Sequence, residues 1–392
     1  MKRRDCLALM GASSLLAGCA GLPAATGTGD LGVVVARATG TLAIVNTSER
    51  KVLAEVQGLG DLSHASVVFS RDGRYAYVFG RDGALTKVDL LTRRTVGRVM
   101  QAGNSIGGAI SADGSMVVAQ NYTPGGIKAF DAATLTLLAD IPAEYAPGKL
   151  SRVVGLVDLP GRRFAYSLFD ADEIWISDLS TPAQPRTTRL RNIGHQPYDA
   201  LVTPNGRHYI AGLFGEDGLA MVDLWEEKPQ VRRILGGYGR GQEPLPVYKM
   251  PHLRGWAVAG RRAYLPAIGR HEVLVVDTDT WQEVGRIPVA GQPVFVMARP
   301  DGRQVWVNFS VPDYHRVQVI DTTTQQIVRT LEPGKAVLHM EFTPRGESVW
   351  ISSRDDHRVS VIDTQTFATQ ATMTIDSPSG IFFTSRAVRL GF

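Results

Sequence analysis

Histidine and basic side chains recur at matching points along this chain, in short polar segments that interrupt apolar runs. Imidazole binds metals and transfers protons near neutral pH, and guanidinium binds carboxylates through paired hydrogen bonds. This combination predicts a site for an anionic ligand that carries carboxylates together with a metal. Six of the eight histidines share the placement: His64, His195, His252, His271, His315 and His357.

The same segments hold basic residues and also some carboxylates. The carboxylates leave open an alternative, in which these side chains form ordinary surface ion pairs. They are Asp82, Asp170, Glu216 and Asp356. The basic residues are Arg81, Lys149, Arg152, Arg191, Arg240, Lys249, Arg270, Arg316 and Arg354.

The elements that position these side chains form a repeat of short strands. One unit reads VVFSRDGRYAYVFGRDGALTKVDLLTRRTVGRV, and a later one reads MARPDGRQVWVNFSVPDYHRVQVIDTTTQQIVRTL. Each unit predicts four strands, with an Asp-Gly turn after the first strand and a Thr-rich turn after the third. Asp-Gly supplies the positive φ angles that tight hairpins need. Units of this kind are typical of β-propeller blades.

Eight such units can be counted, because an acidic residue or asparagine ends the third strand of each. Residues 31–56 resemble strands two to four without a first strand, and residues 377–386 resemble a first strand with nothing after it. We therefore predict an all-β, eight-bladed β-propeller, residues 31–392, closed by a blade shared between the N- and C-terminal segments. The marker residues, 42 to 54 positions apart, are Asn46, Asp89, Asp131, Asp178, Asp223, Asp277, Asp321 and Asp363.

A propeller places the histidines and basic residues on one face of the ring. The loops that lead into the innermost strands and the loops between the second and third strands lie on that face. His64, Arg152, His195 and His252 directly precede innermost strands, so they are expected to converge most closely on the axis. Two of the leading loops, residues 142–152 and 236–252, are unusually long, which favours a functional role.

Residues 1–18 read as a lipoprotein signal peptide, with a basic start and a short apolar stretch. The LAGC motif at positions 16–19 is typical of a lipobox, so lipidation is expected at Cys19, followed by a linker to residue 30. Ala20 lacks the aspartate that retains such proteins at the inner membrane, which indicates a periplasmic protein anchored by lipid in the outer membrane. A chance cysteine beside an ordinary signal peptide is the alternative. Both twin-arginine and general export remain open.

Cysteine content and charge exclude several function classes. The only cysteines are Cys6 and Cys19, so the mature chain is expected to have no disulfide, zinc–thiolate site, cysteine nucleophile or c-type haem. Without residues 1–18 the chain has 39 basic and 37 acidic residues. This balance gives no signature of polyanion binding, and no nucleic-acid partner is expected. Contact with a membrane is expected through the lipid anchor only.

The repeats, the lipobox, the missing c-type haem motif and a lone histidine in GDLSHASVVFSRDGRYAYVFGRDG together resemble one family. It is the cytochrome d1-type eight-bladed propeller family, which includes the d1 domain of cytochrome cd1 nitrite reductase and periplasmic proteins of haem d1 biosynthesis. The resemblance covers residues 31–392. It implies that haem d1 or a dihydro-haem d1 precursor binds at the axis, and that His64 is the axial ligand of the iron.

The resemblance also implies roles for the other residues near the axis, with Arg152 and His195 as the first candidates to hold carboxylates. Nitrite reduction is not expected, because no c-type haem domain is present to deliver electrons. The implied role is tailoring of a late haem d1 precursor for denitrification, by side-chain oxidation, elimination or dehydrogenation, with nitrite reductase and other haem d1 biosynthesis proteins as partners. Predicted catalytic residues are Arg152, His195 and Tyr198; predicted cofactor-binding residues are His64, Arg81, Arg152, Arg191, His195 and His252.

Two other functions remain possible at this point. A non-catalytic carrier that delivers the tetrapyrrole to partner proteins needs the same binding residues, so the sequence does not separate it from an enzyme. A haem-free propeller, such as a sugar-lactone hydrolase or an interaction scaffold, is disfavoured by the concentration of histidine and arginine on one face.

Overall fold

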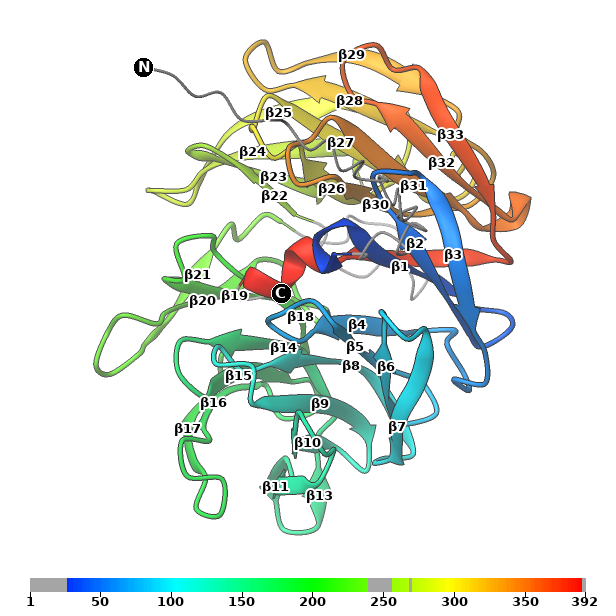
Figure 1. The fold of residues 1–392 in the computed structure, drawn as a ribbon. Coiled ribbons are helices and arrows are strands. Elements are labelled where there is room, and N and C mark those ends of the chain that lie inside the picture. The colour runs from blue at the N-terminus through cyan, green and yellow to red at the C-terminus, as the bar shows by residue number, and fades with distance from the viewer. Residues whose placement is uncertain (1–26, 239–255, 268–269, 390–392) are drawn as a thin grey trace, which may run out of the picture.

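Eight four-stranded antiparallel sheets surround a central axis and close into a ring (Figure 1). The computed structural model describes residues 27–238, 256–267 and 270–389. The first strand of each sheet contacts the first strand of a neighbouring sheet, so these strands line the axis. The predicted eight-bladed all-β propeller is therefore confirmed, and we number its blades from the one that begins with β4.

The strands follow one another outward from the axis in each blade. They are β4 (Ser66–Phe69), β5 (Tyr75–Phe79), β6 (Ala84–Asp89) and β7 (Arg94–Met100) in blade 1; β8 (Asn104–Ile110), β9 (Met116–Thr123), β10 (Gly126–Asp131) and β11 (Leu137–Ile141) in blade 2; β14 (Val153–Leu159), β15 (Arg163–Leu168), β16 (Glu173–Asp178) and β17 (Arg186–Leu190) in blade 3; β18 (Pro197–Val202), β19 (His208–Leu213), β20 (Leu219–Asp223) and β21 (Val231–Ile234) in blade 4; β22 (Ala257–Ala259), β23 (Arg262–Ala267), β24 (Glu272–Asp277) and β25 (Gln282–Pro288) in blade 5; β26 (Pro293–Ala298), β27 (Gln304–Phe309), β28 (Val317–Asp321) and β29 (Gln326–Leu331) in blade 6; β30 (Val337–Phe342), β31 (Ser348–Ser353), β32 (Arg358–Asp363) and β33 (Thr369–Thr374) in blade 7; and β34 (Pro378–Phe383), β1 (Leu31–Ala36), β2 (Thr41–Asn46) and β3 (Lys51–Val56) in blade 8.

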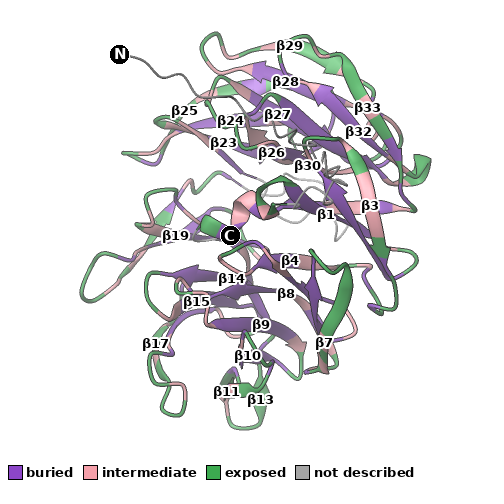
Figure 2. Ribbon diagram, viewed as in Figure 1, coloured by how far each residue is buried: buried purple, intermediate pink, exposed green. Residues whose placement is uncertain are grey.

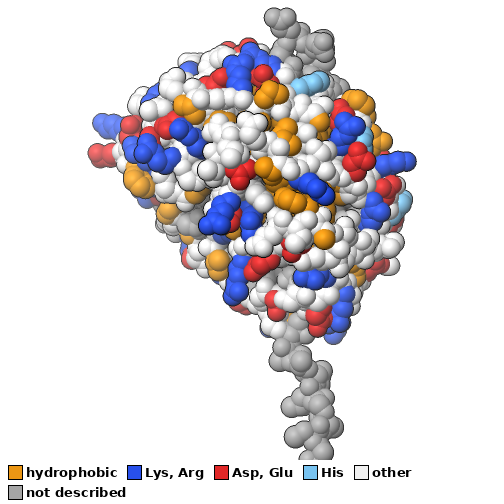
Figure 3. Space-filling model, turned by 90° about the horizontal axis from the view of Figure 1, so that it is seen from above, with side chains coloured by type: hydrophobic (Ala, Val, Ile, Leu, Met, Phe, Trp, Pro, Cys, Tyr) orange, Lys and Arg blue, Asp and Glu red, His pale blue; other side chains and the backbone are white. Residues whose placement is uncertain are grey.

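The core lies between neighbouring sheets, because apolar side chains from both faces of the middle strands interlock across the gap. Every residue of β2 is buried, whereas most residues of the outermost strand β7 are exposed. Figure 2 shows the same gradient around the ring. Basic and acidic side chains are intermingled on the outside of the ring (Figure 3), in line with the nearly balanced charge. None of the helices in the described ranges has the length and hydropathy to span a membrane.

The acidic marker of the repeat orders the turn that follows the third strand. In blade 1, Oδ1 of Asp89 accepts hydrogen bonds from the backbone N–H groups of Leu91 and Thr92 at 3.0 and 3.1 Å. Short polar side chains that bond to nearby backbone in this way favour turns. The same arrangement follows Asp131, Asp277, Asp321 and Asp363.

Blade 8 joins the two ends of the chain, as predicted. Strand β34 pairs antiparallel with β1, and the pairs include Gly32 with Phe383. As expected, no further strand follows β34 within the described residues, and a 3₁₀ helix, η6 (Thr384–Val388), continues the chain. The Thr384 hydroxyl of η6 bonds to the carbonyl of Leu31 at 2.8 Å, so the helix fastens the closing strand to the start of the ring.

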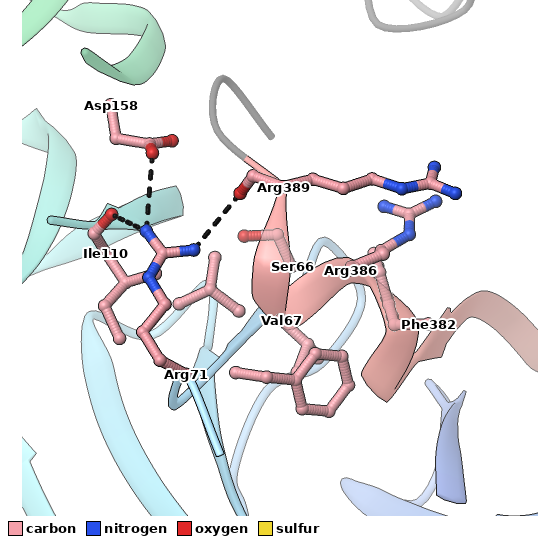
Figure 4. Close-up of a pocket in the computed structure, with 10 residues that line it drawn as sticks. Ser66, Val67, Arg71, Ile110, Asp158, Phe382, Arg386 and Arg389 are labelled. Atoms are coloured by element: carbon pink, nitrogen blue, oxygen red, sulfur yellow. Dashed lines mark hydrogen bonds and ion pairs between the residues drawn. The ribbon is translucent and has the colours of Figure 1, made fainter. Parts of the chain in front are cut away.

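Arg71 ties η6 to the inner ends of the first blades on the face where that helix lies (Figure 4). Its guanidinium donates to the carbonyls of Ala387 and Ile110 at 2.7 and 3.2 Å and lies 3.6 Å from the carboxylate of Asp158. The cavity beside it measures about 30 Å³, enough for little more than one water. The structure offers no room there for a large ligand.

Of the two long leading loops, the structure describes the first in full and only the start of the second. Residues 142–152 contain a hairpin that belongs to no blade, β12 (Glu144–Ala146) with β13 (Lys149–Leu150). Arg189 supports it by donating to the carbonyl of Glu144 at 3.1 Å. Most of the second loop, residues 236–252, lies outside the described residues.

His339, on the innermost strand β30, is enclosed by protein near the axis even though water reaches part of its surface. Its ring packs between Phe295 and Phe382, and its Nδ1 accepts a hydrogen bond from the backbone of Ile381 at 3.2 Å. Burial lowers the pKa of His339 to about 3, with a further lowering from nearby Arg386. The imidazole is therefore neutral throughout the physiological range.

This histidine should make the fold sensitive to acid. The pKa of His339 in the folded protein lies below the unfolded value of about 6.5. Its contribution to the free energy of unfolding is therefore complete above pH 6.5. That contribution is lost as the pH falls further, by up to about 1.4 kcal/mol per pH unit. We expect the melting temperature of the wild type to fall more between pH 7.5 and pH 5 than that of His339→Asn, whose side-chain oxygen can replace Nδ1 as acceptor. Equal falls in melting temperature in the two proteins would show that another group causes the loss of stability at low pH.

Candidate functional site

One face of the ring carries the loops that lead into the innermost strands and the loops between second and third strands. We call it the histidine face, because five of the predicted histidines lie on it within the described residues: His64, His195, His271, His315 and His357. The helix η6 and Arg71 lie on the opposite face, at the other ends of the same strands. The predicted binding and catalytic residues are therefore expected on the histidine face.

His64 lies exposed on the turn that leads into β4. The carboxylate of Asp61 accepts a hydrogen bond from the backbone of Ser63 at 2.8 Å, and the carbonyl of Asp61 accepts one from the backbone of Arg81. Leu62 is buried beneath the turn. The turn is thus fixed to the neighbouring loop of blade 1, while the imidazole remains on the surface beside the axis.

Three arginines from adjacent blades gather beside this turn. Arg37, Arg81 and Arg354 each follow the second strand of their blade, in blades 8, 1 and 7. Burial lowers the pKa of Arg37, and the charges of Arg354 and Arg81 add to that lowering, whereas Asp61 opposes it. The guanidinium group of Arg37 is therefore repelled by those of Arg354 and Arg81.

The three arginines differ in how their charge is balanced. Arg354 forms a 2.6 Å ion pair with Asp355, which raises its pKa. Within the described residues, the guanidinium groups of Arg37 and Arg81 make neither an ion pair nor a side-chain hydrogen bond, although both side chains are half-buried. Partly buried cations without a paired anion are unfavourable. A carboxylate ligand would supply the missing counter-charge.

Arg152, at the start of β14, is held by the protein itself. Its guanidinium forms paired hydrogen bonds with Asp170 at 2.5 and 3.0 Å and lies 4.2 Å from the ring centroid of Phe169. The hydrogen bonds that Arg152 donates to Asp170 raise the pKa of Arg152. A ligand carboxylate must therefore share or displace Asp170 to bind this arginine, so it is less available than Arg37 or Arg81.

An aromatic cluster lies beside Arg152, between blades 2 and 4. Phe169, Tyr198 and Phe214 have ring centroids 6.0 to 6.3 Å apart. The Tyr198 hydroxyl lies 3.0 Å from that of Tyr122, at the end of β9. Burial raises the pKa of both tyrosines, so both hydroxyls stay protonated at physiological pH. We call these four residues the aromatic shelf.

His195 leads into the strand that carries Tyr198, and carboxylates orient it. Its Nδ1 lies 3.3 Å from Asp172, and its backbone N–H donates to Glu216 at 3.0 Å. Its side chain is 57% exposed. An exposed imidazole with one nitrogen beside a carboxylate can exchange protons with a bound ligand.

The structure brings together most, but not all, of the predicted site residues. His64 lies beside Arg81, and Arg152 lies beside Tyr198, with Arg81 close enough to influence the Tyr198 hydroxyl. Arg191 is set apart, since it follows an outermost strand, is exposed and pairs with Glu173 at 3.4 Å. His252 and Cys19 lie outside the described residues. In the ranges that are described, no group of three or more His, Cys, Asp or Glu side chains could hold a metal ion.

Sequence reasoning missed Arg37 and most of the aromatic shelf. Arg37 directly follows a second strand, as Arg354 does, and Arg81 lies one residue further along in its blade. Alignment of the shared blade 8 with the complete blades would have identified it. Tyr122, Phe169 and Phe214 carry no comparable signal, because aromatic residues are common throughout the blades.

Together these groups can bind a flat, acidic ligand. The shelf offers aromatic faces and neutral donors, the unpaired guanidinium groups offer cations, and His64 offers an imidazole nitrogen that can reach a metal. A planar metal chelate with carboxylate side chains has each of the complementary features.

Comparison with known proteins agrees with this chemistry. Residues 26–387 match the Cytochrome D1 heme domain. The chain is 61% identical to Protein NirF of Stutzerimonas stutzeri over 98% of both chains, and 58% identical to Protein NirF of Pseudomonas aeruginosa over 96% of this chain and 97% of that one. Among solved structures, it resembles dihydro-heme d1 dehydrogenase NirN in complex with DHE, with a TM-score of 0.80, 26% identity, and coverage of 94% of this chain and 78% of that chain.

Proposed function

Because this chain belongs to the cytochrome d1 haem-domain family, in its NirF branch, and so has a part in haem d1 biosynthesis, we propose that it binds a late haem d1 precursor on the histidine face and acts in tailoring it. The precursor is dihydro-haem d1 or an earlier form. The modification is a side-chain oxidation, elimination or dehydrogenation.

One observation carries the proposal. Two half-buried guanidinium groups, Arg37 and Arg81, lie beside His64 without a paired anion in the described part of the chain. A tetrapyrrole with carboxylate side chains supplies anions to both arginines and an iron to the imidazole. Asp61 acts electrostatically on both arginines but forms no ion pair with either. A haem-free propeller would gain nothing from leaving them without an anion in direct contact, which disfavours the hydrolase and scaffold alternatives.

The aromatic shelf and His195 support a catalytic role over simple carriage. Tyr198 and His195 lie three positions apart around the start of β18 and provide a phenol and an imidazole for proton transfer. Arg152 reinforces this side of the site with a fixed positive charge. A carrier needs affinity for its cargo but does not need groups that move protons.

The proposed setting is the periplasm. The signal peptide and the lipobox at Cys19 support anchoring by lipid to the outer membrane, from which a finished or partly finished haem d1 can pass to other biosynthesis proteins and to nitrite reductase. This setting suits a cofactor that is used outside the cytoplasm in denitrification.

A single-turnover experiment tests the tailoring role. Protein lacking residues 1–19 is loaded with one equivalent of dihydro-haem d1 and supplied with at least two equivalents of a one-electron acceptor, since a dehydrogenation removes two electrons. The extracted pigment is examined by mass spectrometry. We expect a change in the mass of the pigment that depends on the protein. Recovery of unchanged pigment from protein that has bound it would instead favour the carrier.

A further inference from the structure

The Tyr122–Tyr198 pair has a feature that simple packing does not require. The two residues come from blades 2 and 4, and their hydroxyl oxygens meet at 3.0 Å beside the start of β14. Phenol side chains that serve only as packing can be phenylalanine, as Phe169 and Phe214 are in the same cluster. The hydroxyl groups are therefore expected to have a purpose of their own.

Tyr122 is the member of the pair that can donate a further hydrogen bond. Each phenol has one O–H, and one hydrogen bond between the two hydroxyls uses one proton. When Tyr198 donates to Tyr122, the proton of Tyr122 is directed away from the pair, and among the described residues the Tyr122 hydroxyl bonds to no other group. Since burial keeps both phenols protonated, this donor persists over the physiological pH range.

The donor lies close to cations of the site. Arg152, the nearest guanidinium, is committed to Asp170 through two hydrogen bonds. The charges of Arg152 and Arg81 both act on the Tyr198 hydroxyl. A ligand therefore meets a neutral donor and aromatic rings next to positive charge.

We propose that the Tyr122–Tyr198 pair donates a hydrogen bond to an oxygen at the edge of the bound tetrapyrrole, and so determines which macrocycle is accepted and in which orientation. The inference rests on the proposed function. The acceptor is an oxygen of the ligand, either a carbonyl on the ring or a side-chain carboxylate. The pair would then determine specificity, while Arg37 and Arg81 supply charge attraction.

Two ligands distinguish these acceptors. Haem d1 carries ring carbonyls and carboxylates, whereas protohaem carries carboxylates only. Dissociation constants for both are measured by absorbance titration on the wild type, Tyr122→Phe and Tyr198→Phe. Tyr145→Phe, in the hairpin β12–β13 away from the shelf, is the control. Loss of one hydrogen bond corresponds to an affinity roughly threefold to tenfold weaker.

Weaker binding of haem d1 alone would identify a ring carbonyl as the acceptor, and equal weakening of both ligands would identify a carboxylate. Unchanged affinity and unchanged bound-state spectra in both Phe variants would overturn the inference. Failure of the wild type to bind haem d1 would overturn the proposed function instead. Melting temperatures separate loss of contact from loss of fold, and Tyr122→Phe, at the end of a strand, keeps the test valid if Tyr198→Phe is unstable.

Discussion

Replacement of His64 by alanine is expected to displace the visible absorption bands of bound haem d1 and to weaken its binding at least about tenfold, as for the loss of a metal ligand. The imidazole is exposed, and its turn is held by Asp61 and Leu62, so the fold should be unaffected. The melting temperature of the ligand-free variant should therefore match that of the wild type. Absorbance titration and thermal unfolding measure the two effects separately.

His315→Ala provides a matched control, since His315 also lies on the histidine face but on a loop between second and third strands. Free imidazole added to His64→Ala should restore part of the wild-type spectrum by occupying the vacated position. A His64→Ala spectrum identical to that of the wild type would remove this residue from the axial role.

Neutralising Arg37 and Arg81 together should have an effect at least as large. Each charged hydrogen bond to a carboxylate contributes about 1.5–3 kcal/mol, so Arg37→Gln with Arg81→Gln should weaken ligand binding by about a hundredfold or more. The same change removes repulsion between half-buried cations. The free energy of unfolding of the ligand-free protein should therefore stay constant or rise, which is the signature of residues kept for binding and not for stability.

Arg316→Gln serves as the control, because Arg316 lies on the same face in an ion pair with Asp313 at 3.0 Å. It should leave the affinity unchanged. The lysine variant Arg37→Lys should retain part of the affinity, since charge is kept while the paired hydrogen bonds are lost. If the double glutamine variant bound haem d1 as tightly as the wild type, the carboxylates would have to bind elsewhere.

The sequence predicted the architecture well because the repeat marks its own turns. The acidic residue that ends each third strand, such as Asp89, organises the next turn through local hydrogen bonds, so its spacing counts the blades. Elements outside the repeat were missed. The hairpin β12–β13 depends on long-range support from Arg189, and η6 depends on Arg71 and Thr384, contacts that no local pattern reveals.

The candidate site was predicted less completely, since side-chain pairing decides which residues are available. Arg152 and Arg81 look equivalent in sequence, but Asp170 already neutralises the first and no described carboxylate pairs with the second. Arg37 was overlooked because its blade is split between the two ends of the chain. Which arginines lack partners is a property of the closed ring and not of any single repeat.

Blade 8 also constrains the kinetics of folding. The bond from Thr384 to Leu31 joins residues 353 positions apart, so ring closure incurs the loop entropy of almost the whole chain. Contacts of such long range place a protein among slow folders. Until β34 has been synthesised, β1 presents an unpaired edge that favours association with other chains. Whether the chain folds or aggregates therefore depends on how fast the last twenty or so residues pair with β1.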